Sequence, residues 1–167
     1  MTTFAGICCE IRPLRPRDKG ALRRFFLSHD PDTIRQRYGG AIASLDDNAL
    51  SRLTNGPDKS TYAYGVFETG AKPATLHAVG RLCFDESMES AEVAFVVGEK
   101  KRGQGMATNL LRSLTQEAIQ RGLKRLTAEV DPQNHPMLHV LAANGFAPTI
   151  DKRVSGLSLS RDLTGRA

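Results

Sequence analysis

The 167-residue sequence contains no tryptophan, few aromatic residues and only three cysteines. Two of the cysteines, Cys8 and Cys9, are adjacent, and Cys83 lies far from them. This arrangement supplies neither a disulfide framework nor a four-ligand zinc site. The four histidines, His29, His77, His135 and His139, also lack the spacing of a metal site, because Pro136 interrupts the one close pair. We therefore expect no bound metal and a reducing compartment.

The sequence also lacks a long hydrophobic run. Nowhere do about 18 apolar residues follow one another, and the N-terminus has no basic segment followed by a continuous apolar stretch. These absences predict a cytoplasmic protein with no membrane partner. The length predicts a single domain, residues 1–167, with a core of its own. No signal for a particular oligomeric state is visible.

The net charge is positive, but it is not concentrated. The formal charge is +5 and the isoelectric point is near 9.4, yet the basic residues are scattered along the chain and no aromatic residues interleave with them. Nucleic-acid binding needs a basic stripe or patch. We therefore expect no nucleic-acid partner, and phosphate groups on a small molecule explain the local positive charge more simply.

Hydrophobic periodicity predicts an alternation of strands and helices. Strands are expected at Ile7 to Pro13, Thr61 to Glu68, Leu76 to Phe84, Ala91 to Val97, Leu126 to Val130 and Val154 to Leu159. Helices are expected at Lys19 to Ser28, Asp30 to Arg37, Leu45 to Leu53, Thr108 to Arg121 and Pro136 to Asn144, with caps at Asp18 and at Ser44 with Asp47. Three consecutive strands form an antiparallel meander, and the strand, helix, strand order over Ala91 to Val130 requires a parallel pair. The fold class is mixed α/β.

The most informative stretch is a glycine-rich turn between an apolar strand and an amphipathic helix. Gly103 and Gly105 allow positive φ angles and close approach of a ligand, and the following helix presents unpaired amides to an anion. Arg102, Lys100 and Lys101 add positive charge. The segment matches neither the dinucleotide fingerprint nor a P-loop, and on its own it also fits a tight turn with a solvated charge cluster.

This loop, Arg102-Gly103-Gln104-Gly105-Met106-Ala107, resembles the acetyl-coenzyme A pyrophosphate loop of the GNAT superfamily of N-acetyltransferases. The order of elements and the segment from Asn134 to Phe146 are similar to that superfamily along the whole chain. Further motifs resemble the bacterial protein lysine acetyltransferases that modify acyl-CoA synthetases: Ile11 to Asp18, Phe25-Phe26, Arg37-Tyr38 and Glu92 to Val97. The resemblance implies a GNAT fold, with a mostly antiparallel sheet, a central parallel strand pair and flanking helices.

The resemblance also implies a site for acetyl-CoA as co-substrate. The backbones of Phe95 and Val97 would contact the pantetheine arm, and Asn134 would contact the arm or merely cap a helix before Pro136. The implied loop residues are Arg102, Gly103, Gln104, Gly105, Met106, Ala107 and Thr108.

Glu92 is the candidate catalytic base. An alkylammonium must lose its proton before its nitrogen can attack a thioester, and a carboxylate can accept that proton. An acidic side chain in the apolar strand around Val93 and Phe95 is costly to bury without a role. Its position matches the glutamate of the protein acetyltransferases, although an ion pair with Arg81 would also explain it.

One group usual in the superfamily is absent. Leu141 occupies the position where many members carry a tyrosine that protonates the leaving thiolate; solvent, His135 or His139 would have to replace it. The resemblance implies direct transfer of an acetyl group, in a ternary complex, to a primary amine. The acceptor would be a protein lysine, for example on an acyl-CoA synthetase, or a small amine. A non-catalytic acyl-CoA-binding or sensing module is the alternative that Leu141 favours.

Overall fold

The computed structural model describes residues 1–32, 46–54, 60–150 and 156–165. Within these ranges one eight-stranded sheet has the strand order β1-β2-β3-β4-β5-β6-β8-β7. Its strands are β1 (Thr2–Phe4), β2 (Ile7–Pro13), β3 (Thr61–Glu68), β4 (Leu76–Phe84), β5 (Ser90–Val97), β6 (Arg125–Val130), β7 (Ala147–Thr149) and β8 (Leu157–Asp162). The helices are α1 (Lys19–Leu27), α3 (Asp47–Thr54), α4 (Met106–Gln120) and α5 (His135–Ala143), with short 3-10 turns η1 (Pro16–Asp18) and η3 (Glu99–Lys101).

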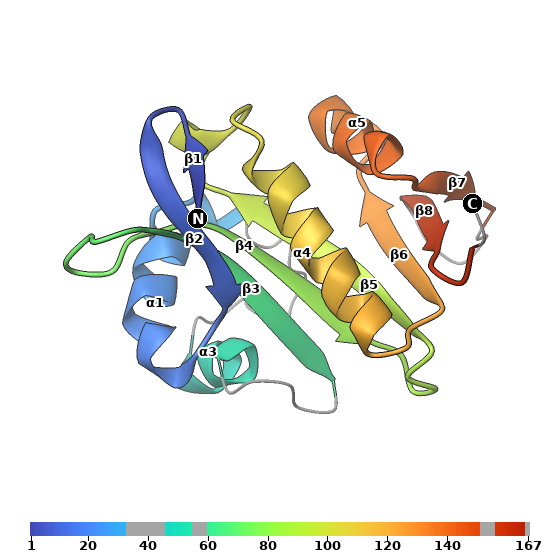
Figure 1. Ribbon diagram of the computed structural model, residues 1–167, viewed down its shortest axis with the longest axis horizontal. Helices are drawn as coiled ribbons and strands as arrows, with labels where there is room; N and C mark the ends of the chain where they lie inside the picture. The colour runs from blue at the N-terminus through green and yellow to red at the C-terminus, as the bar shows by residue number, and fades with distance from the viewer. Residues whose placement is uncertain (33–45, 55–59, 151–155, 166–167) are drawn as a thin grey trace.

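The predicted topology is confirmed. Strands β2 to β5 form an antiparallel meander, whereas β5 and β6 are parallel and are joined by α4. Helix α4 crosses one face of the sheet, and α1 and α3 lie against the other (Figure 1). The sheet is therefore mixed, mostly antiparallel and covered by helices on both faces.

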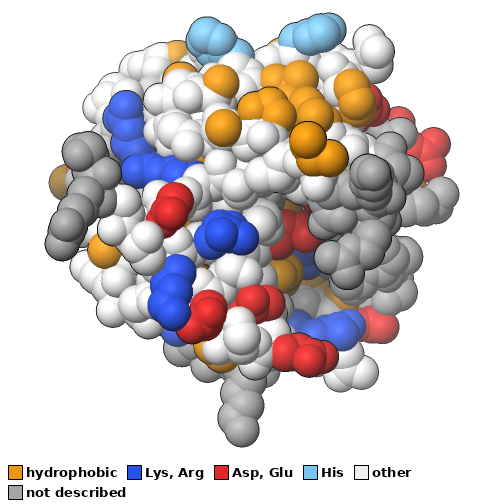
Figure 2. All heavy atoms as spheres, turned by 90° about the vertical axis from the view of Figure 1, so that its right-hand side faces the viewer, with side chains coloured by type: hydrophobic (Ala, Val, Ile, Leu, Met, Phe, Trp, Pro, Cys, Tyr) orange, Lys and Arg blue, Asp and Glu red, His pale blue; other side chains and the backbone are white. Residues whose placement is uncertain are grey.

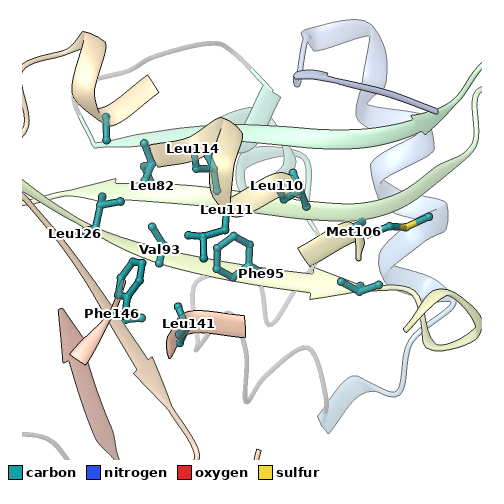
Figure 3. Close-up of a cluster of buried hydrophobic side chains, with 14 of the residues drawn as sticks. Leu82, Val93, Phe95, Met106, Leu110, Leu111, Leu114, Leu126, Leu141 and Phe146 are labelled. Atoms are coloured by element: carbon teal, nitrogen blue, oxygen red, sulfur yellow. The ribbon is translucent and has the colours of Figure 1, made fainter. Parts of the chain in front are cut away.

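Two hydrophobic clusters hold these layers together. The larger lies between α4 and the sheet and contains Leu82, Val93, Phe95, Leu110, Leu114 and Leu126 (Figure 3). The smaller packs Leu22, Phe26 and Leu50 of α1 and α3 against Val79 and Val96. In β5, the alternate residues Ala91, Val93, Phe95 and Val97 belong to the larger cluster, whereas Val96 on the other face belongs to the smaller one. This alternation matters for the site, because Glu92 takes a position on the α1 face.

The ends of several elements differ from the prediction. Helix α3 begins at Asp47, and Asp46 caps it by accepting a hydrogen bond from the Ala49 amide at 2.8 Å. Asp18 stands at the N-cap of α1, but its side chain makes no capping hydrogen bond and pairs with Arg12 instead. The predicted helix to Arg37 lies largely outside the described residues, as do Ser44 and the start of the last predicted strand.

Strands β1 and β7 are absent from the prediction. Each contains three residues, too few for a period to show. The β1–β2 hairpin turns at Ala5 and Gly6, which both have positive φ, and this pair lacks the usual Asn-Gly or Asp-Gly signal.

Candidate active site

The parallel strands β5 and β6 separate part of the way along their length. Their register runs from the pair Ser90 and Arg125 to the pair Glu92 and Thr127, and it ends there although β5 continues to Val97 and β6 to Val130. The two strands diverge toward α5 (Figure 1). A cavity of about 490 Å³ lies at this split, and its walls are Val93, Ala94, Phe95, Ala128, Glu129, Val130, Asp131, Gln133, Asn134, Met137 and Leu141. The split therefore leaves the edge of β5 beyond Glu92 open to a ligand.

The loop before α4 has the conformation that its glycines predict. Gly103 and Gly105 have φ angles of +74° and +83°, and Gly105 is the N-cap of the 15-residue helix α4. Gly105 has no side chain to cap that helix, so the first amides of the helix and its positive dipole end are available to an anion. A second cavity of about 480 Å³ lies here, lined by Val97, Lys101, Arg102, Gly103, Gly105, Met106, Ala107, Thr108, Asn134, Pro136, Met137, His139 and Val140.

The two cavities share Asn134 and Met137 in their walls, so they adjoin. Nine of the ten predicted cofactor-binding residues line one or both of them. Gln104 is the exception, because its side-chain amide turns back to the Lys100 carbonyl at 3.4 Å. Met106 is 1% exposed, so it can face the cavity through its backbone while its side chain packs in the core.

Asn134 has the capping role that the sequence left open. Its side-chain oxygen accepts a hydrogen bond from the Met137 amide at 3.3 Å, and it occupies the N-cap of α5. This bond fixes Asn134 where β6 ends and both cavities meet. A contact from Asn134 to the cofactor arm remains a prediction.

Glu92 lies at the closed end of the split, one residue before the first cavity-lining residue of β5. Burial raises the pKa of its carboxyl group, and the negative charge of Glu129 raises it further, while the positive charge of Arg81 lowers it. Within the described ranges no hydrogen bond or ion pair holds the Glu92 carboxylate, so the proposed pairing with Arg81 is not formed there. A half-buried carboxyl group with a raised pKa is suited to accept a proton near neutral pH.

The end of β5 is fixed from both sides by buried histidines. The Gly98 amide donates to the His77 carbonyl at 2.8 Å, and the His77 ring contacts Glu68 at 2.9 Å. His29 Nε2 lies 3.4 Å from the Val97 carbonyl oxygen, and its Nδ1 lies 2.7 Å from the Phe25 carbonyl oxygen. These contacts hold the start of the glycine loop against α1 and β4.

Several wall residues were missed from the sequence. Pro136, Met137 and Val140 belong to α5, an apolar helix in which Leu141 is the only buried residue. His139, which was considered from the sequence only as a replacement acid, lies in the same wall. Glu129 is the more informative omission, since it interrupts the apolar strand β6 as Glu92 interrupts β5. The same signal applied to β6 would have found it.

Among the described residues, no group of three or more histidine, cysteine or acidic side chains is arranged to hold a metal ion. Among the same residues, no helix has the length and apolar character needed to span a membrane.

The family model of the acetyltransferase (GNAT) domain matches residues 9–147 of the chain. The chain belongs to this family. The GNAT domain of S. lividans PAT is similar in fold, with a TM-score of 0.81 and 23% identity over 93% of this chain and 90% of that chain. The putative acetyltransferase yncA of Salmonella typhimurium, solved with its cofactor acetyl-CoA, has a TM-score of 0.67 and 19% identity over 95% of this GNAT chain and 96% of its own.

A third similar structure is longer. The cAMP-binding acyltransferase from Mycobacterium smegmatis has a TM-score of 0.64 and 20% identity, and the match covers 97% of this GNAT chain but 46% of that chain. The predicted superfamily and fold class are thus confirmed.

Proposed function

We propose that this GNAT chain is an acetyl-CoA-dependent N-acetyltransferase that transfers an acetyl group to a primary amine, and that the amine is a lysine side chain of a protein. The observation that carries the proposal is the end of β5–β6 pairing at Glu92 and Thr127. That split opens the cavity beside Glu92 and joins it to the cavity at the uncapped start of α4.

The residues fit the chemistry of acetyl-CoA. The first amides of α4, together with Lys101 and Arg102, supply donors and positive charge for the diphosphate. The open edge of β5 from Val93 onward offers backbone groups to an amide-containing arm. When bound, acetyl-CoA supplies the thioester, and both substrates are present together in the adjoining cavities.

The reaction requires few groups from the protein. Glu92 takes the proton from the acceptor ammonium, directly or through water, and the nitrogen forms a bond to the thioester carbonyl carbon. Backbone amides of β5 polarise the carbonyl oxygen. The carbon–sulfur bond then breaks, and solvent protonates the thiolate, whose ordinary pKa of about 8.5 makes it a tolerable leaving group.

A non-catalytic acyl-CoA-binding module is the second candidate. Leu141 favours it, because this side chain is 1% exposed in the wall of the first cavity, where many superfamily members carry the acid tyrosine. Such a module would bind coenzyme A and show no turnover.

The test is acetyl-CoA turnover measured by thiol release, with lysine-containing proteins, an acyl-CoA synthetase among them, and small amines as acceptors. Turnover with a protein acceptor supports the proposal. Turnover with small amines alone would keep the transferase and overturn the protein substrate. Tight binding of coenzyme A with no turnover would favour the binding module.

The cofactor part of the proposal can be tested separately with two matched glycines. Gly105 and Gly122 have φ angles of +83° and +77°, and they lie at opposite ends of α4. Alanine at either position should cost about 1–2 kcal/mol of folding stability. Only Gly105→Ala should also raise the KM for acetyl-CoA, by about tenfold, because Gly105 lines the cavity at the start of α4 where the diphosphate is proposed to bind. An equal KM in both variants would place the diphosphate elsewhere.

A further inference from the structure

The two adjoining cavities carry opposite charges. We call the cavity between β5 and β6 the split cavity and the cavity at the glycine loop the loop cavity. Among the described wall residues, the charged side chains of the loop cavity are Lys101 and Arg102, whereas those of the split cavity are Glu129 and Asp131. The chain as a whole is positively charged. The negative charge of the split cavity is therefore opposite in sign to the net charge of the chain.

Glu129 and Glu92 lie on the same face of the sheet. Leu126, Ala128 and Val130 belong to the core under α4, so Thr127 and Glu129 project from the opposite face. Ala91 and Val93 belong to the same core, which places Glu92 on that opposite face as well.

The two glutamates flank the beginning of the split. Glu92 is level with Thr127, the last paired residue of β6, and Glu129 lies two positions further along that strand. Two positions correspond to about 6–7 Å along a strand. Glu129 is exposed and lines the split cavity, so it stands on the solvent-facing side, which we call the mouth of the split. Glu92 is half-buried and stands at the closed end, where the strands still pair.

The two carboxylates repel each other across this gap. The negative charge of Glu129 contributes to the raised pKa of Glu92, second only to burial, while Arg81 on β4 acts in the opposite direction. On the face in Figure 2 the surface is hollowed, and acidic and basic side chains are both visible inside the hollow. A cation placed between the two carboxylates would relieve their repulsion and satisfy both.

We infer that Glu129 is a specificity-determining residue that binds the ammonium group of the acceptor and selects primary alkylammonium substrates over neutral amines. The inference rests on the proposed transferase function and assigns its acceptor side. Glu129 holds the cation at the mouth of the split, and the proton is then lost to Glu92. Neutral nucleophiles reach the same place without this attraction.

The experiment compares Glu129→Gln with wild type, using two acceptors near neutral pH: N-acetyl-lysine methylamide, which is an alkylammonium, and an aniline, which is neutral. The variant should raise the KM for the lysine derivative by about tenfold or more, because a charge-assisted contact is lost. The KM values for the aniline and for acetyl-CoA should stay unchanged. Glu86→Gln, an exposed glutamate in the turn before β5, is the matched control and should behave as wild type.

An unchanged KM for the lysine derivative, or an equal rise for both acceptors, would overturn the role of Glu129. If wild type shows no turnover at all, calorimetric titration of N-acetyl-lysine methylamide into the protein saturated with coenzyme A decides the matter. Binding that weakens in Glu129→Gln supports the cation site even though the transferase proposal fails. Equal binding by both proteins, or no binding by either, overturns it.

Discussion

Glu92→Gln should lower kcat by about 10²–10⁴-fold with any amine acceptor, because the variant keeps the shape of the side chain and loses the proton acceptor. The KM for acetyl-CoA should stay near the wild-type value. Glu92 lies outside the walls of the loop cavity, so its charge contributes little to diphosphate binding. Thiol release measured over a range of acetyl-CoA concentrations at saturating acceptor, with kcat and KM both fitted, measures the two effects.

The pH dependence distinguishes a base from a structural residue. Burial and the charge of Glu129 raise the pKa of Glu92 above its ordinary value, and the carboxylate is the active form. Activity of the wild type should therefore fall as the pH drops through this raised pKa, at a higher pH than an unperturbed glutamate would give. This acidic limb should be missing from the residual activity of Glu92→Gln.

Glu99→Gln is the matched control for this prediction. Glu99 follows the same strand but is exposed in η3, and the substitution removes the same charge. It should leave kcat and the pH profile unchanged. If Glu92→Gln instead lowers the melting temperature and leaves kcat as it was, Glu92 is a structural residue and the mechanism proposed here is wrong.

The sequence predicts those parts of the site that depend on local chemistry. The loop glycines predict positive φ because few other residues adopt it, and the structure confirms this at Gly103 and Gly105. Strands β2, β3 and β4 have the predicted bounds, since their apolar patterns extend to the turn residues on each side. These features are decided within a few residues of each position.

The rest of the site depends on where two strands stop pairing. The end of the β5–β6 register at Glu92 and Thr127 has no sequence signal of its own, because the core-facing residues of both strands, such as Val93 and Ala128, remain apolar beyond it. The cavity walls from α5 and the position of Glu129 follow from that divergence. A single sequence shows which residues could carry charge into a site, but not which of them face the same opening.

The predicted cap of α1 by Asp18 fails for a different reason. Its position before a helix predicts a cap, yet its carboxylate accepts hydrogen bonds from Arg12 at 2.7 and 2.9 Å and from the Arg15 amide at 2.8 Å. The Arg12 guanidinium lies 3.8 Å from the centre of the Phe67 ring, and Asp18 is 3% exposed. The ion pair therefore ties the start of α1 to β2 and so to the sheet.

Asp18→Asn should lower the free energy of unfolding by about 3 kcal/mol, because it leaves the charge of Arg12 buried without its main partner. For a chain of this length the melting temperature should fall by roughly 6–12 °C. Glu89→Gln removes a carboxylate from an exposed pair with Lys124 and should cost less than about 1 kcal/mol. Urea denaturation of both variants and wild type measures the difference.

The effect should also depend on pH in a defined direction. Burial opposes ionisation of Asp18, but the bonds from Arg12 and the Arg15 amide outweigh it, so the pKa of Asp18 is lowered in the folded protein. A carboxyl group of this kind stabilises the fold above its unfolded pKa of about 3.9, and that stability is lost as the pH falls through the folded pKa. The gap between wild type and Asp18→Asn should therefore be full near neutral pH and narrow below about pH 4.

A constant gap across that range would show that Asp18 acts by packing and not by charge. Confirmation of the predicted gap would also indicate that the resemblance at Ile11 to Asp18 concerns folding and not the choice of acceptor. Arg12 and Asp18 are the charged partners within that motif, and both are used to dock α1 on the sheet, away from the split between β5 and β6. The motif then indicates a shared structure of the N-terminal part of the fold. The residues that determine the choice of acceptor are instead expected at the split, at Glu92 and Glu129.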